Sequence, residues 1–283
     1  PKPTSFKFNK SLIKSTEKEI QRIENFFVKK YSSKYALLMP SGRAAINLIL
    51  NYFKFNRSNV VSVPKWTSGC LYSSIGSITN ISVDNLDKSN CIIIVHKWGS
   101  TFKLNIKKKK IIKIEDSADC LPNGLYKPFE NNSNFEILSL SKIIGSYYGG
   151  IILTKDKLFY NHCKKFQTNN TLLSIAKLKK KYKESLKNNN TLSGYDETIY
   201  DSFDGNLTAN IIKNLKNFKL NINIIKNRQA YIKKIFPSFS FDKKRLGPVI
   251  LFPQKKFVAL KKILELKHFN FRKNLRSNNY EKC

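Results

Sequence analysis

Long apolar runs, clustered cysteines and acidic residues are all scarce in this sequence. No stretch approaches the roughly 20 consecutive apolar residues of a membrane-spanning helix, and the opening PKPTSFKFNK lacks the apolar core of a signal peptide. The five cysteines form neither a CxxC pair nor a metal-like cluster, and an odd number does not suit a disulfide framework. We therefore expect a cytoplasmic protein with free thiols and no metal site.

The shortage of acidic residues leaves a large positive charge. There are 19 Asp and Glu against 52 Lys and Arg, a formal net charge of +33. Such a charge fits binding to nucleic acid or to an anionic membrane surface, or it reflects a compositional bias, since Asn, Ile and Phe are also abundant. The lysines are spread along the chain, and even the KKKK run at 107–110 fits a solvated loop. We favour the bias, although the charge also attracts phosphate-bearing substrates.

The hydrophobic pattern predicts an α/β fold. Helical spacing marks 15–31, a Ser-Gly turn after ALLMP opens a second helix, and further helices are expected at 67–77 and 156–168. Apolar β-branched runs, typical of strands buried on both faces of a largely parallel sheet, occur at 59–64, 78–84, 91–96, 110–116, 135–141 and 150–154.

The pattern changes along the second half of the chain. We expect a large domain over 1–205, in which 169–205 is an irregular polar excursion. Residues 206–283 then form a long helix at 207–236 followed by strand, helix and strand, a reduced C-terminal α+β domain.

Several polar features follow predicted strands, where open α/β sheets place their ligand sites. The turn at Ser41 and Gly42 leads into a helix, and its amides suit a phosphate, although small residues also cap helices for structural reasons alone. Asp116 ends a buried strand, where it is either a helix N-cap or an ion with a partner.

A lysine and a tryptophan complete the set. Lys142 stands in SLSKIIGSYYGG, where it either extends to water or takes part in chemistry. Trp66 and Thr67 follow the strand at 59–64. A Schiff-base lysine, a carboxylate for a pyridine nitrogen, a phosphate turn and a stacking aromatic are the parts of a pyridoxal 5'-phosphate (PLP) site.

Five segments resemble, in order and approximate spacing, the DegT/StrS-type aminotransferases, which have the aspartate aminotransferase fold and act on nucleotide-linked keto sugars. The resemblance covers about residues 15–168, with a looser match beyond. The segments are SGRAAINLIL, VPKWTSG, IIIVHKWGS, KIEDSADC and SLSKIIGSYYGGIILT.

The resemblance implies roles for individual residues. Lys142 would carry PLP as an internal aldimine and then shuttle the substrate proton, and Asp116 would pair with the pyridine nitrogen. The turn formed by Ser41, Gly42 and Arg43 would bind the phosphate. The resemblance also implies a homodimer whose sites lie at the subunit interface, so that Asn206 would reach the partner's phosphate.

The sequence departs from the family pattern at three places. Asp119 stands where Gln or His usually lies near the cofactor's phenolic oxygen, and a carboxylate there repels a phenolate. Ile137 replaces the usual phosphate-binding serine, and Ser139, on the same strand face, is the expected substitute. Trp66 precedes Thr67 instead of following it, so it is either the stacking ring or a core residue.

The resemblance also separates several functions. We expect an aminotransferase that moves an amino group, from glutamate, to a nucleotide-linked keto sugar. Dehydration or another non-transfer reaction is the alternative, motivated by Asp119 and the short C-terminal part, but histidine replaces Lys142 in the dehydratase branch. A basic nucleic-acid or membrane-surface protein on an old aminotransferase fold is the third hypothesis. His96 and His162 are interpreted as structural.

Overall fold

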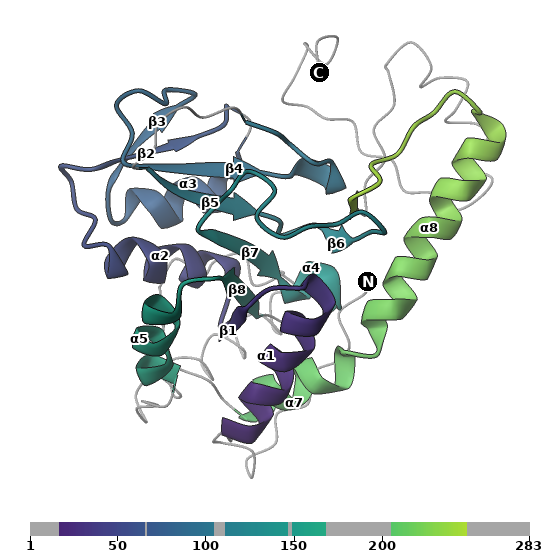
Figure 1. Cartoon of the computed structure of the whole chain (residues 1–283), viewed down its shortest axis with the longest axis horizontal. Helices are drawn as coiled ribbons and strands as arrows, with labels where there is room; N and C mark the ends of the chain where they lie inside the picture. The colour runs from purple at the N-terminus through teal and green to yellow at the C-terminus, as the bar shows by residue number, and fades with distance from the viewer. Residues whose placement is uncertain (1–16, 66, 105–110, 147–148, 168–204, 248–283) are drawn as a thin grey trace, which may run out of the picture. The chain divides into compact units, whose positions relative to one another are not determined.

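The computed structural model describes residues 17–65, 67–104, 111–146, 149–167 and 205–247 (Figure 1). The chain divides into two compact units, Pro1–Pro248 and Val249–Cys283. All described residues belong to the first unit. The predicted irregular excursion and the predicted strand, helix and strand at the C-terminus therefore lie outside the described residues.

A seven-stranded sheet, in the order β1-β8-β7-β5-β4-β2-β3, forms the centre of the described part. Only β8 runs antiparallel to its neighbours in this sheet. The predicted mostly parallel α/β fold is therefore confirmed. The strands are β1 (Tyr35–Met39), β2 (Val60–Val63), β3 (Asn80–Val83), β4 (Cys91–Val95), β5 (Ile112–Asp116), β7 (Phe135–Ser139) and β8 (Gly150–Thr154), and β6 (Leu121–Pro122) pairs separately with β9 (Arg245–Leu246).

Helices connect and cover these strands. Within the described ranges, none is long and apolar enough to cross a membrane. They are α1 (Glu17–Tyr31), α2 (Gly42–Tyr52), α3 (Gly69–Gly76), the short α4 (Leu140–Ile143), α5 (Lys157–Gln167), α7 (Gly205–Asn214) and α8 (Asn217–Ile235), with one 3-10 turn at Lys97–Gly99.

The continuous apolar runs of the strands are explained by burial on both faces of the sheet. Leu37 and Met39 of β1 pack in one core with α2, α3 and α5. Ala36 and Leu38, which alternate with them, pack in a second core with α1, α7 and α8. Because successive side chains of a strand point to opposite faces, both sets must be apolar. Each fully buried large apolar side chain contributes about 1.5–3 kcal/mol.

The single long helix predicted for 207–236 is wrong, because α7 and α8 are separate helices. Asn214 ends the first and Asn217 begins the second. The side-chain amide of Asn217 donates to the Asn214 side chain at 3.0 Å and to the main-chain oxygen of Ile144 at 3.1 Å. Asparagine side chains compete in this way with helical hydrogen bonds, and helical periodicity alone does not reveal it.

Candidate active site

Lys142 lies on a short helix at the carboxyl end of β7. The predicted strand at 135–141 is too long, because β7 ends at Ser139 and the chain turns into α4. The side chain of Lys142 is 53% exposed, and its Nζ lies 2.7 Å from Oδ1 of Asp119. Burial lowers the pKa of Lys142, but the ion pair with Asp119, helped by the charge of Asp116, outweighs it and the pKa is raised. Lys142 is thus held as an ammonium ion.

Asp116 is the last residue of β5, the strand next to β7. Its carboxylate accepts a hydrogen bond from the main-chain amide of Ala118 at 2.9 Å. Burial raises the pKa of Asp116, while that hydrogen bond and the Lys142 ammonium act in the opposite direction. The two residues that the sequence predicted as catalytic therefore interact electrostatically at one edge of the sheet.

The predicted phosphate turn lies at the same edge. Ser41 caps α2, and its Oγ accepts from the amide of Ala44 at 3.1 Å. A Cβ on Gly150 would lie 2.5 Å from the carbonyl carbon of Ser41 and 2.7 Å from the amide nitrogen of Gly42. The Ser41–Gly42 turn therefore packs directly against the backbone of Gly150, which has no side chain. The first amides of a helix have no intrahelical partner, so the start of α2 suits an anion.

Strand register brings Ser139 to this turn. Met39 of β1 and Ser139 of β7 both pair with Gly150, the strand residue between them. The Oγ of Ser139 lies 3.1 Å from the Oγ of Ser141. Arg43, on the first turn of α2, is partly exposed, and its main-chain oxygen accepts from Ser74.

Two predicted cofactor contacts cannot be placed. Trp66 lies outside the described residues, and the side chain of Asn206, in the first turn of α7, is not described either. Thr67, beside Trp66, donates from Oγ1 to the main-chain oxygen of Pro64 at 2.7 Å. The ring-stacking and partner-phosphate roles therefore stay predictions.

The buried His96 makes contacts that fit a structural role. Its Nδ1 accepts from the amide of Phe102 at 3.0 Å, so the proton of the neutral ring is on Nε2. Nε2 then donates to Oε2 of Glu115 at 2.8 Å. His162 is on the exposed side of α5, with its ring 5.1 Å from that of Tyr52.

The sequence did not reveal a buried ionic cluster on the opposite face of β5. Glu115 and Glu136 are register partners on β5 and β7, and Arg245 of β9 lies 3.3 Å and 3.0 Å from their carboxylates. Burial raises the pKa of Glu115, but the His96 hydrogen bond and other contacts outweigh it, so the pKa is lowered. The sequence did carry a signal for this cluster, because Glu115 and Glu136 stand inside apolar strands and a buried carboxylate needs a partner.

A second contact missed from the sequence links α8 to the lysine segment. The side-chain amides of Asn217 and Asn221 donate to the main-chain oxygens of Ile144 and Ile143, at 3.1 and 2.8 Å. These carbonyl groups belong to the end of α4, directly after Lys142. Helix α8 therefore holds the turn that presents the lysine.

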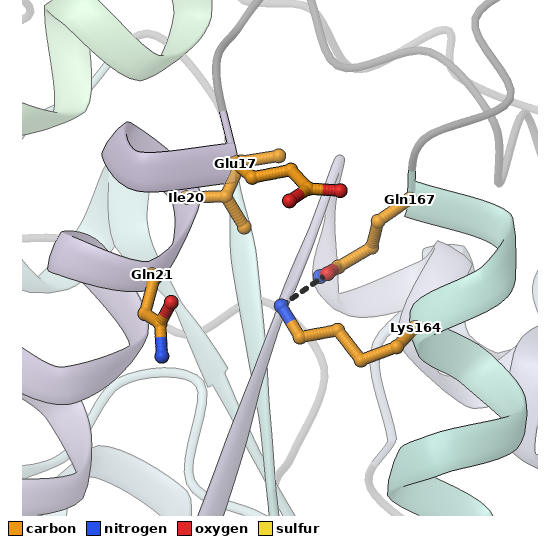
Figure 2. A pocket seen from close by; sticks show the side chains of 5 residues that line it. All are labelled: Glu17, Ile20, Gln21, Lys164 and Gln167. Atoms are coloured by element: carbon orange, nitrogen blue, oxygen red, sulfur yellow. Dashed lines mark hydrogen bonds between the residues drawn. The ribbon is translucent and has the colours of Figure 1, made fainter.

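A separate hollow of about 230 Å³ lies between α1 and α5 (Figure 2). Two of the lining residues also bind the buried Glu24, which accepts from Lys164 at 2.6 Å and from Gln167 at 2.7 Å, as well as from the amide of Leu38 at 2.9 Å. Because the polar groups of Glu24, Lys164 and Gln167 hydrogen-bond to one another, we do not interpret this hollow as a ligand site. It is lined by Glu17, Ile20, Gln21, Lys164 and Gln167.

The residues at the Lys142 edge fit PLP. A lysine, a carboxylate and a helix start lie together, and the space that a Cβ of Gly150 would need is taken by the backbone of Ser41 and Gly42. Lysine and carboxylate match the aldehyde and the pyridine nitrogen of the cofactor, and the helix start matches its phosphate.

Comparison with known proteins identifies relatives of this chain and of its fold. Over 182 residues the chain is 25% identical to GDP-perosamine synthase of Escherichia coli O157:H7, an alignment that spans 55% of this chain and only 50% of that relative. Two solved structures share the fold. An E. coli GDP-4-keto-6-deoxy-D-mannose-3-dehydratase with bound hydrated PLP is 16% identical, with a TM-score of 0.63 over 93% of this chain and 79% of that one. A DegT DnrJ EryC1 StrS aminotransferase from Brucella abortus is 14% identical, with a TM-score of 0.58 over 83% and 69%.

The family model that matches covers most of the chain. It spans residues 23–283 and is described as "Putative PLP-dependent aminotransferase". The predicted family and its cofactor are thereby confirmed, and the chain belongs to this family of PLP-dependent aminotransferases.

Proposed function

We propose that this chain transfers an amino group from an amino-acid donor, glutamate, to a keto sugar carried on a nucleotide. The observation that carries the proposal is the meeting of Lys142, Asp116 and the Ser41–Gly42 turn at one edge of the sheet. The similarity to GDP-perosamine synthase supports a nucleotide-linked sugar as the acceptor.

Each residue at the edge has a chemical task in this proposal. PLP, when bound, supplies the ring that accepts electrons from the substrate carbon. The Nζ of Lys142 would hold the cofactor through its aldehyde carbon and would serve as the group that moves the substrate proton. Asp116, as a carboxylate, stabilises a protonated pyridine nitrogen, and the charge gained there offsets the burial that raises the pKa of Asp116.

The cofactor's phosphate is bound at the start of α2. The amides of Gly42 and Arg43 would donate to it, the hydroxyls of Ser41 and Ser139 would be available as further donors, and the Arg43 guanidinium would add a charge-assisted contact. Trp66, which lies outside the described residues, is the stacking residue that this proposal expects. The proposed domains are 1–205 and 206–283, and the first elements of the second, α7 and α8, belong to the compact unit that ends at Pro248.

Cofactor binding tests the proposal directly. Purified protein mixed with PLP should turn yellow, and borohydride should fix the cofactor to the peptide that contains Lys142. Lys142→Ala should abolish both, whereas Lys127→Ala, which removes an exposed lysine from a loop, should change neither. A wild-type protein that stays colourless, with no cofactor attached to the Lys142 peptide after borohydride treatment, would contradict the proposal.

The reaction is tested by a half-reaction. Glutamate added to the loaded protein should give one equivalent of 2-oxoglutarate per site and bleach the yellow colour. Asp116→Asn should keep the covalent cofactor but slow this step by on the order of 10²-fold. Loaded protein that gives no 2-oxoglutarate would instead favour the non-transfer alternative, for which the carboxylate of Asp119 at Lys142 is the supporting observation.

The site is completed, in this proposal, by a second copy of the chain. If Asn206 of one subunit contributes to the other's phosphate site, Lys142→Ala and Asn206→Ala chains are each inactive alone. Mixed and reassociated, they form dimers in which one of the two sites is intact. Partial recovery of activity on mixing is expected, and sedimentation at the same concentration should show a dimer.

A further inference from the structure

Asp119 makes the closest contact that Lys142 has in the described part of the molecule. Its Oδ1 lies 2.7 Å from Nζ, and it comes from the turn that follows β5. The other titratable groups that act on the lysine are Asp116, at the end of β5, and Cys70, in the first turn of α3. The two carboxylates add to the negative potential around Nζ, and Asp119 contacts it directly.

An ion pair at this position conflicts with the chemistry required of the lysine. Only a neutral amine attacks an aldehyde, so Nζ must first lose a proton. The contact with Asp119 stabilises the charged form, and the pKa of Lys142 is raised although burial alone would lower it. At neutral pH a smaller fraction of Lys142 is therefore neutral than in an ordinary exposed lysine.

We propose that Asp119 is a positioning residue that holds Lys142 as an ammonium in the cofactor-free protein and thereby limits the rate at which PLP is loaded. The proposal rests on the proposed cofactor role of Lys142. Loading would require the Lys142–Asp119 contact to open and Nζ to lose one proton to solvent. The neutral amine would then form a C=N bond to the aldehyde carbon of PLP, and the aldehyde oxygen would leave as water with the two remaining amine hydrogens. More than half of the Lys142 side chain is exposed, so water reaches it.

The charge of Lys142 can be measured without cofactor. Cofactor-free protein is labelled with trace acetic anhydride at a series of pH values, and mass spectrometry follows acetylation of the Lys142 peptide. We expect Asp119→Asn to move the midpoint of this curve down by about one pH unit, since an opposite charge at contact distance shifts a pKa by about 1–3 units. Asp119→Glu should restore most of the shift.

Control variants separate this effect from a loss of structure or of overall charge. Asp87→Asn removes the same charge from an exposed position between β3 and β4 and should leave the curve unchanged. Asp119→Ser, which also lacks the charge, should behave like Asp119→Asn. Equal midpoints in the wild type and both neutral variants, with circular dichroism unchanged, would overturn the proposal.

Loading is then followed by the rise of visible absorption after PLP is added. At pH 7 Asp119→Asn should load about tenfold faster than the wild type, and the difference should vanish at high pH. If the labelling curves shift but neither protein takes up PLP, the proposed function is refuted, whereas the effect of Asp119 on the charge of Lys142 is confirmed. If both proteins load at equal rates and label alike, only the role of Asp119 is refuted.

Discussion

The side-chain amide of Asn221 in α8 donates a hydrogen bond to the main-chain oxygen of Ile143, the residue that follows Lys142, across 2.8 Å. Asn221→Ala leaves this carbonyl without its partner. We expect a loss of about 1 kcal/mol in the free energy of unfolding and slower covalent loading of PLP, because the turn that presents Lys142 is less well held.

The control for this prediction lies on the same helix. Asn223 is exposed on α8, and Asn223→Ala makes the same chemical change two residues away. Urea unfolding and the loading rate should both stay at the wild-type value in this variant. Equal behaviour of the two variants would show that α8 does not support the lysine turn.

Gly150→Ala is expected to displace the phosphate turn. The added methyl group would lie 2.5 Å from the carbonyl carbon of Ser41, so the backbone of the turn would have to move, which is energetically costly. We expect the PLP dissociation constant, measured by titrating visible absorption, to rise at least about tenfold, which corresponds to about 1.4 kcal/mol. Gly124→Ala, where nothing lies within 4 Å of the new atom, should bind PLP normally.

Lys164→Met should destabilise the protein more at pH 7 than at pH 5. Burial raises the pKa of Glu24, and the Lys164 ammonium at 2.6 Å opposes this. A carboxyl group whose pKa is raised in the folded state lowers the free energy of unfolding when it ionises. This loss grows as the pH rises from the ordinary glutamate pKa through the folded-state pKa. Loss of the Lys164 cation raises the pKa of Glu24 further. The loss in the free energy of unfolding of Lys164→Met, relative to wild type, therefore grows with pH and reaches about 2 kcal/mol at pH 7.

Urea unfolding at the two pH values measures this difference. Lys157→Met, which changes an exposed lysine on the same helix, should show no such pH dependence. A loss of stability in Lys164→Met that is the same at pH 5 and pH 7 would contradict the assignment of Glu24 as the responsible group.

Arg245→Met is expected to be among the most destabilising single changes. It leaves two fully buried carboxylates, Glu115 and Glu136, without their cation, which costs about 3–5 kcal/mol. Because the pKa of Glu115 is lowered, its stabilising effect is present above the ordinary glutamate pKa and is lost as the pH falls through the folded-state pKa. The variant should therefore lose most stability at neutral pH, and the difference from wild type should shrink on acidification.

Thermal or urea unfolding gives this comparison. Arg228→Met, at an exposed position on α8, is the matched control and should unfold like the wild type at every pH. A stability of Arg245→Met at pH 7 equal to that of the wild type would contradict the assignment of Arg245 as the cation on which the buried Glu115 and Glu136 depend.

The sequence by itself indicated the mostly parallel character of the sheet and placed Asp116 and Lys142 at the ends of predicted strands. Runs such as CIIIV and GIILT carry consecutive apolar residues because both faces of the sheet are covered, and this pattern is visible without a structure. Asp116 and Lys142 follow two such runs, and the carboxyl ends of adjacent parallel strands meet at one edge. The pattern did not fix where a strand stops, so the turn into α4 and the break between α7 and α8 were not foreseen.

Only the tertiary structure decided which polar groups contact one another across the fold. Asp119 faces Lys142, Asn221 supports the Lys142 turn, and Arg245 lies between two buried carboxylates. Each contact joins residues that are distant in the chain, so local periodicity carries no record of it. The neighbouring strands β5 and β7 bring Asp119 to Lys142, and the packing of α8 and β9 supplies the other two contacts, because a buried charge or carbonyl group needs a partner that the fold must supply.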